Sequence, residues 1–346
     1  MRMESRMARF IGRRAILAFL TVWAVITIVF VLMKITPGDQ AQLAAGAGAS
    51  PEAVAAVRER LGLDQTIIVQ YWQFLNSVIH GDLGTSTLTH QPVSSSLVSV
   101  LPHTIQLIAA AMFLNVCIAV PIGIIAGVRS QSRLDGSVRV LAIFLGSLPT
   151  FWFGLVLQYL LSVKSNVFPL SGVVSDNLTI ADVTGFSFFD AVITLNWVGL
   201  SDVSAHLLLP ALTLAVSFAG FVVRVVRVAV ADVLESDHIT AAAAKGASPL
   251  RVIVKHVLRR AASPVVSLLG LQVGWMIGGA IIVEGIFGRP GVGLYLLQAV
   301  QQKDTFAVLG AVIFVGAIVA LMGVLVDLFQ ILNDAQVRAR ELGGAR

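Results

Sequence analysis

The run AILAFLTVWAVITIVFVLM occupies residues 15–33 and contains no charged side chain. As a helix it is long enough to cross the hydrocarbon core of a bilayer, which is roughly 30 Å thick. The run is longer than the roughly 7–15 apolar residues of a secretory signal peptide, so it predicts an uncleaved first transmembrane helix. The small residues that follow at 43–50, LAAGAGAS, keep a cleaved signal peptide as the alternative.

Further apolar runs of similar length predict an all-α integral membrane protein with six transmembrane helices. The composition agrees, because 57% of the 346 residues are hydrophobic, only 12% are charged, and the mean hydropathy is +0.88. A soluble domain has about 25% charged residues. The additional predicted spans are 104–128, 140–163, 207–223, 261–283 and 306–326.

The distribution of basic residues predicts that both termini are cytoplasmic. With six spans, the N-terminal tail, 129–139, 224–260 and the C-terminal tail are cytoplasmic and hold most of the 24 Lys and Arg residues. Counting 185–200 as a seventh span would place the basic loop outside, so we expect that segment at the outer surface. The pI near 9.8 then follows from topology, and we expect no nucleic-acid partner.

The predicted spans divide the chain into a short first part, an outer loop, a core and a C-terminal tail. The outer loop is expected to contain two short helices, one starting at Ser50-Pro51-Glu52 and one over 66–80. The expected divisions are 1–36 (N-terminal tail and first helix), 37–103 (extracytoplasmic loop), 104–340 (five-helix core, with an outer segment at 164–205 and a cytoplasmic loop at 229–260) and 341–346 (C-terminal tail).

Sequence motifs for catalysis or ATP binding are missing. The chain contains no G-x-x-x-x-G-K-[ST], H-E-x-x-H or G-x-S-x-G pattern, so we expect no enzyme, metal site or cofactor in this chain. The predicted spans are almost free of ionisable residues, which argues against an ion-coupled carrier. Arg224, Arg227 and Asp327 lie at span ends, where either interfacial anchoring or a gating role fits.

Small residues and prolines predict contacts and breaks within the spans. Gly270, Gly274 and Gly278 are spaced by four, which predicts a stripe for close helix packing inside the chain or with a partner. Pro149 and Pro264 predict kinks or helix breaks.

The stretch ITAAAAKGASP (239–249) lies in the long basic loop between the fourth and fifth spans. Its composition predicts a helix that ends at Gly246 and a second helix that starts at Ser248-Pro249. One interpretation is that the alanines only stabilise the helix, because alanine is a good helix former. Alternatively, its small side chains let another protein approach the backbone closely.

The same stretch resembles the E-A-A-x-x-x-G loop of ABC importer permeases, with Thr240-Ala241-Ala242 at the E-A-A positions and Gly246 at the glycine. The match is partial: the glutamate of that pattern is absent, and so are the isoleucine and proline further along it, where His256 and Arg259 stand. Other segments resemble the B-type subunit of the dipeptide, oligopeptide and nickel branch, so the likeness covers nearly the whole chain. They are TPGD (36–39), LGLDQ (61–65), VQYW (69–72), GDLGTS (81–86), QPV (91–93), LPTFW (148–152), FPLSG (168–172), AKGAS (244–248), VEGIFGRPGVG (283–293) and DAQVR (334–338).

The resemblance implies a type I ABC importer permease in a bacterial inner membrane, surrounded by membrane lipid. It implies a homologous second permease, two ABC ATPase subunits that bind ATP and Mg, and an extracytoplasmic substrate-binding protein. It also implies a coupling helix at Thr240, Ala241, Ala242, Ala243, Ala244, Lys245, Gly246, Ala247, Ser248 and Pro249.

The resemblance implies di- or oligopeptides as the substrate, with a nickel chelate, glutathione or an opine as alternatives. A stand-alone secondary carrier or channel is the alternative from another class. The residues that contact substrate stay open.

Overall fold

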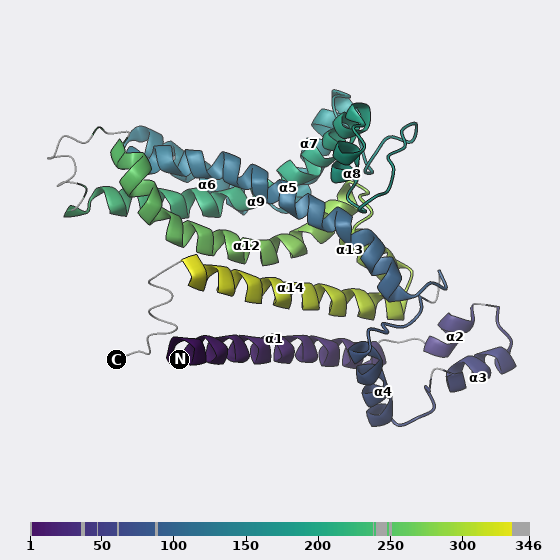
Figure 1. Ribbon diagram of the computed structural model, residues 1–346. Helices are drawn as coiled ribbons and strands as arrows, with labels where there is room; N and C mark the ends of the chain where they lie inside the picture. Colours follow the sequence, from purple (N-terminus) through teal and green to yellow (C-terminus); the bar gives the residue numbers. More distant parts are fainter. Residues whose placement is uncertain are drawn as a thin grey trace.

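The computed structural model describes residues 2–35, 39–46, 48–60, 62–86, 89–237, 239, 248 and 251–333 (Figure 1). These residues form helices and loops, and the one β-type pairing among them is an isolated bridge between Thr85 and Pro92. The described part of the chain is therefore all-α, as the sequence predicts.

Five helices of the described residues are long and apolar enough to cross a membrane, and a bent helix pair gives a sixth span if it is counted as one. The five are α1 (Arg2–Ile35), α5 (Val93–Val128), α9 (Trp197–Leu234), α12 (Leu258–Ile286) and α14 (Thr305–Asn333). The bent pair is α6 (Arg133–Ser147) followed by α7 (Thr150–Gln158), which continues as the π-helix η1 (Tyr159–Lys164).

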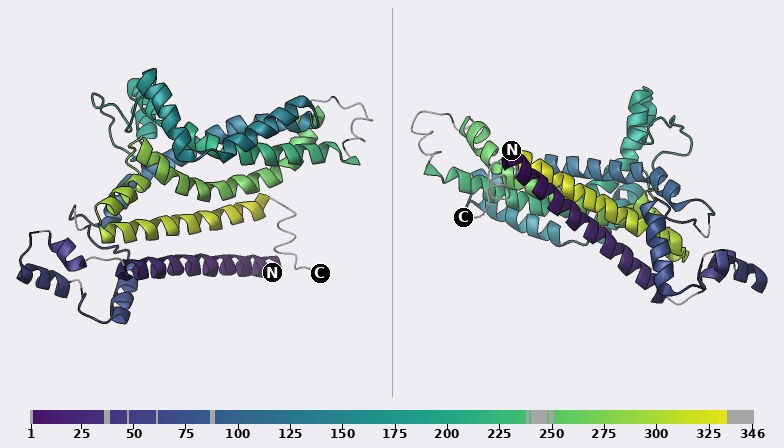
Figure 2. Two further views of the ribbon diagram at one scale, coloured as in Figure 1. Left: turned by 180° about the vertical axis from the view of Figure 1, so that it is seen from behind. Right: turned by 60° about the horizontal axis from the view of Figure 1, so that its bottom comes forward.

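The long helices form a bundle of roughly parallel rods (Figures 1 and 2). Helix α9 packs along α5 and also contacts α6 and α12, while α14 packs between α12 and α1. Helix α1 begins and α14 ends at one end of the bundle, called here the proximal end. The opposite, distal end carries the short helices α2 (Gln40–Ala45), α3 (Pro51–Arg60) and α4 (Ile67–Ile79).

The third predicted span, 140–163, is not one straight helix. Helices α6 and α7 meet at 94°, and α7 projects away from the bundle (Figure 1). Leu148 is extended (φ −71°, ψ 130°) because the ring of Pro149 disfavours a helical conformation in the preceding residue. Pro149 then precedes the first turn of α7, where its missing N–H costs nothing.

Pro264 does not break its helix, so of the predicted kink or break only a kink stays a prediction. It lies inside α12, which runs without a break from Leu258 to Ile286. A proline close to the start of a helix removes only one hydrogen bond, and neighbouring helices in a bundle can stabilise the remaining turns.

Helix boundaries also differ from the sequence predictions at two other places. Helix α9 begins at Trp197, so the end of the surface segment expected at 185–200 belongs to this long helix, while α8 (Ser187–Ile193) is a separate short helix. At its other end α9 stops at Leu234, within the stretch expected to stay helical as far as Gly246. The sequence analysis did not predict α13 (Val292–Gln301), a short apolar helix between α12 and α14.

Three apolar clusters hold the bundle together, and the one nearest the predicted coupling loop is called the proximal cluster. Its buried members come from α5, α6, α9, α12, η2 (Val252–Val257) and the chain just after α9. They are Ala119, Ala142, Ala219, Val222, Val223, Val226, Val230, Ile239, Val252, Val257, Ala261 and Val265.

Candidate transport and coupling site

The predicted coupling helix falls mostly outside the described residues. Thr240 to Ala247 and Pro249 are not described, whereas Ser248 is described and exposed. The Ser248 hydroxyl accepts a hydrogen bond from the Arg251 N–H at 3.4 Å, and its carbonyl accepts one from the Val252 N–H at 3.0 Å. These contacts fit the predicted helix start, while the coupling role itself stays a prediction.

Both ends of that loop are anchored in the proximal cluster. Ile239 on one side, and Val252 and Val257 on the other, are buried in it together with Val226 and Val230 of α9. The two ends of the loop thus share one packed support.

An ion pair ties the proximal end of α9 to the start of α6. Nε and Nη2 of Arg227 donate to the two carboxylate oxygens of Asp135 at 2.7 and 2.8 Å. Asp135 is fully buried and also accepts the N–H of Gln131 at 3.0 Å. The Arg227 side chain is therefore held by a partner, whereas Arg224 is exposed. The side chain of Asp327 lies outside the described residues.

Two glycines allow α5 and α9 to approach closely. A Cβ added to Gly123 would lie 2.6 Å from Cβ of Val226, and one added to Gly127 would lie 2.7 Å from the Arg227 carbonyl oxygen. Side chains cannot be added here without moving a backbone. The sequence analysis did not single out these residues, although their spacing of four is the same signal as in the fifth span.

Of the three glycines in the predicted stripe on α12, one packs closely against another helix of this chain and two do not. A Cβ at Gly270 would lie 2.3 Å from a methyl group of Val326 on α14. At Gly274 and Gly278 an added Cβ would meet no heavy atom of the described residues within 4 Å. Contact of these two glycines with a partner stays a prediction.

At the distal end a buried carboxylate joins three helices. Glu284 of α12 accepts the Thr104 hydroxyl of α5 at 2.6 Å and the Gly293 N–H of α13 at 2.7 Å. The Thr104 oxygen in turn accepts the Val292 N–H at 2.8 Å. A negative charge at the first turn of α13 is electrostatically favourable. Gly291 leaves room for this carboxylate, because its Cβ would lie 2.2 Å from a Glu284 oxygen.

Arg289 lies beside this junction and is fully buried. Its Nε donates to the His103 carbonyl at 3.4 Å, while neither terminal nitrogen has a hydrogen-bond partner among the described residues. Burial lowers the pKa of Arg289 to about 10, and the negative charge of Glu284 opposes that shift. The guanidinium therefore stays charged at neutral pH.

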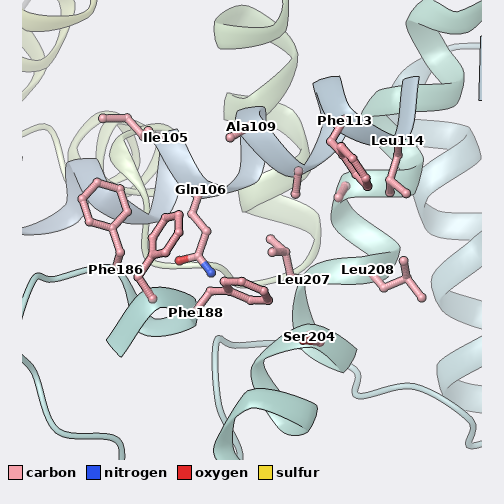
Figure 3. A pocket seen from close by; sticks show the side chains of 13 residues that line it. Ile105, Gln106, Ala109, Phe113, Leu114, Phe186, Phe188, Ser204, Leu207 and Leu208 are labelled. Carbon is pink, nitrogen blue, oxygen red and sulfur yellow. The ribbon is translucent and has the colours of Figure 1, made fainter. Parts of the chain in front are cut away.

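A cavity of about 550 Å³ lies in the distal half, between α5, α8 and α9. Figure 3 shows its lining, with Gln106 reaching from α5 toward Phe188 and Leu207. The segment that carries α8 is fixed by buried Asp190, whose carboxylate accepts the N–H and hydroxyl of Thr184 at 2.8 and 2.6 Å. The sequence analysis did not identify this cavity.

Comparison with known families gives two matches along the chain. Residues 119–339 match the family described as binding-protein-dependent transport system inner membrane component. Residues 7–108 match the family described as the N-terminal part of the binding-protein-dependent transport system membrane component. Together these matches include every described helix except the first residues of α1 (2–6) and the middle of α5 (109–118).

Several curated proteins are similar over nearly the full length. The dipeptide transport system permease protein DppB of Escherichia coli strain K12 is 37% identical over 339 residues, covering 97% of this chain and 100% of that protein. The di/tripeptide transport system permease protein DppB of Pseudomonas aeruginosa strain UCBPP-PA14 is 33% identical, covering 96% and 99%. Among solved structures, a chain of the MetNI methionine ABC transporter in an inward facing conformation aligns with a TM-score of 0.47 and 19% identity, covering 70% of this chain and 95% of that one.

Proposed function

This chain belongs to the family of binding-protein-dependent transport system inner membrane components, and from that premise we propose that it is a permease subunit of an ATP-driven importer of di- or oligopeptides. It is a multi-pass inner membrane protein. The observation that carries the peptide assignment is the 37% identity to a dipeptide permease with both chains covered almost completely. Nickel chelates, glutathione and opines are the alternative substrates.

In this proposal the chain forms half of the translocation path and a homologous permease forms the other half. Two ABC ATPase subunits bind ATP and Mg, and an extracytoplasmic binding protein delivers the peptide at the distal end. The proximal end then faces the cytoplasm, with both termini. The exposed apolar side chains of α7, Phe151, Trp152 and Leu155, support a partner subunit, because α7 projects away from this chain's own bundle.

Coupling would pass through residues 240–249. The proximal cluster supports this role because it anchors both ends of the loop against α9 and η2. Moving a two-state gate from 1:99 to 99:1 takes about 5.5 kcal/mol of differential binding. A segment anchored at both ends transmits such a difference to the spanning helices better than a free loop does.

Affinity purification of the tagged chain from membranes, followed by mass spectrometry, tests the proposal. We expect one homologous permease and one or two ATPases with the wild type. The ATPases should be lost in Gly246→Glu and kept in Ser137→Glu, which places the same charge at an exposed position near the same end. A chain recovered alone that transports in liposomes without ATP would instead identify a secondary carrier or channel.

A further inference from the structure

Helix α4 of the outer loop carries an exposed apolar stripe. Ile68, Trp72 and Ile79 follow one another at spacings of four and seven residues, so they lie on one side of the helix. Their side chains are 70%, 63% and 71% exposed. Leu75 lies on the same side between them and is partly buried. A contiguous apolar surface of this kind, here called the α4 stripe, marks a contact with another molecule or with a membrane.

A second side of α4 is held against α1. The hydroxyl groups of Tyr71 and Thr27 share a hydrogen bond at 2.8 Å, and the Tyr71 ring meets that of Phe30 edge-on, with 5.3 Å between the centroids. Lys34, near the end of α1, donates to Oε1 of Gln70 at 2.5 Å. These contacts fix the rotation of α4 about its own axis, so the α4 stripe has one orientation relative to α1.

The third side of α4 is polar. An α-helix turns by about 100° per residue, so Gln73 and Asn76, which follow Trp72 and Leu75 directly, face away from the α4 stripe. Both of these polar side chains are exposed. Helix α4 contains no charged residue. It is therefore amphipathic, with one side packed on α1, one apolar side and one neutral polar side.

The position of α4 matches the surface of a bilayer. The spanning helices are roughly parallel, whereas α4 lies across the distal end of α1 and leaves the bundle sideways (Figures 1 and 2). A membrane normal that follows the spans places α4 along the membrane surface. The apolar surface of α1 reaches the same level, because Ile28, Leu32 and Ile35 in its last turns are exposed. The α4 stripe thus begins where the lipid-facing surface of α1 ends.

A lipid surface fits the α4 stripe better than a soluble protein does. A soluble partner that binds and leaves would expose the stripe to water between encounters, whereas the bilayer beside α1 covers it continuously. The charged side chains of the outer loop lie on α3 instead, where Glu52, Glu59 and Arg60 are exposed. Helix α3 therefore suits water or a soluble partner, while α4 suits the boundary between headgroups and acyl chains, at which Trp is enriched.

We propose that α4 lies in the plane of the membrane at the distal end of the bundle, with the α4 stripe in contact with lipid acyl chains and Gln73 and Asn76 toward water. The helix then anchors the outer loop, because α2 and α3 precede it in the chain and the tight turn at 81–86 follows it. This inference rests on the chain being an inner membrane protein and not on the substrate that it transports.

Depth measurements with nitroxide spin labels test the inference in the complete transporter, reconstituted in liposomes of phosphatidylethanolamine and phosphatidylglycerol. Labels are attached one at a time at Ile68→Cys, Ile79→Cys, Gln73→Cys and Asn76→Cys, in a transporter freed of other cysteines by Cys117→Ser in this chain. We expect the two labels on the α4 stripe to lie about 5–10 Å deeper than the two on the polar side. The deeper labels should collide with oxygen, and the shallower ones with water-soluble chromium oxalate.

Three outcomes would overturn the inference. Equal access of chromium oxalate to all four labels would show that the α4 stripe faces water. Shielding of the stripe labels only after the binding protein is added would assign the stripe to that protein, and spin–spin broadening between stripe labels would assign it to a second copy of this chain.

A pair of double variants tests the stripe by its chemistry. With a label at Trp72→Cys, the change Ile68→Asp with Ile79→Asp should move the label out of the acyl-chain region, because two carboxylates resist burial in lipid. Gln73→Asp with Asn76→Asp adds the same charges on the polar side and should leave the label at its depth. An unchanged depth in the stripe variant would overturn the inference, and the four single labels decide the question where that variant fails to assemble.

Discussion

Arg227 and Asp135 form a two-point ion pair that joins α9 to the first turn of α6, across 92 residues of sequence. The Asp135 side chain is 0% exposed and that of Arg227 is 18% exposed. Removing Arg227 therefore leaves a buried carboxylate, whereas removing Asp135 leaves a guanidinium that can reach water.

We expect Arg227→Ala to lower the free energy of unfolding by about 1–3 kcal/mol, because buried Asp135 loses its two-point partner and keeps only Arg139, 3.8 Å away, as a cation. Asp135→Ala should cost less, since the Arg227 side chain can reach water. Thermal or SDS unfolding of the purified complex measures both. Arg224→Ala, at an exposed position three residues away, should change stability by no more than about 0.5 kcal/mol. Equal effects of Arg227→Ala and Arg224→Ala would contradict a stabilising pair.

Gly127→Ala should weaken the contact between α5 and α9. The added methyl group would lie 2.7 Å from the Arg227 carbonyl oxygen, so one helix must move, at a cost of about 1–3 kcal/mol. Gly136→Ala on α6 is the control, because its Cβ meets nothing within 4 Å among the described residues. There alanine should be neutral or stabilising by up to about 1 kcal/mol. The same unfolding assay compares the two variants, and a harmless Gly127→Ala would show that α5 and α9 separate easily.

Glu284→Gln should loosen the junction of α5, α12 and α13. The amide has one acceptor oxygen where the carboxylate has two, so a donor from Thr104 or Gly293 loses its partner, at a cost of about 1–3 kcal/mol. Gly291→Ala should act alike by displacing the carboxylate. Hydrogen exchange should speed up at the Gly293 and Leu294 amides in both variants. Exposed Glu52→Gln should leave these amides unchanged, and equally slow exchange in all three would exclude the capping role.

Ala242→Arg should abolish uptake while the protein still reaches the membrane. If residues 240–249 dock on an ATPase, a long cation in place of a methyl group blocks close approach. Uptake of labelled peptide and immunoblotting of the membrane fraction check both parts. Ser137→Arg, exposed near the same end, should transport normally. Normal uptake by Ala242→Arg would remove the coupling assignment.

The sequence was sufficient for the elements that depend on local properties. Long uncharged runs located the spans, and Pro149 marked the break between α6 and α7 because proline acts on its immediate neighbours. Pro264 shows the limit of the same argument, because α12 continues through it and the packing around a helix decides whether a proline ends it. The Ser50-Pro51 start of α3 was also predicted correctly from residue type alone.

The missed features depend on contacts between distant residues. Glu284 gains its role from Thr104, which lies 180 positions earlier. Asp135 is buried because α9 brings Arg227 to it, and nothing in the residues around Asp135 indicates this. Gln106 gave the one available signal for the cavity, as an uncharged polar residue inside a predicted span. Its lack of partners became visible only once α8 was placed beside it.

The shared anchoring of the loop has a mechanical consequence. Ile239 enters and Val252 leaves the loop through the same packed block, which also holds α5 and α9. A displacement of the loop should therefore move α5 and α9 together, because both ends of the loop pack into the same cluster as these helices. The same two helices continue from this cluster to the distal half, where α5 carries Thr104 of the Glu284 junction and both line the cavity, so the displacement has a direct route to that region.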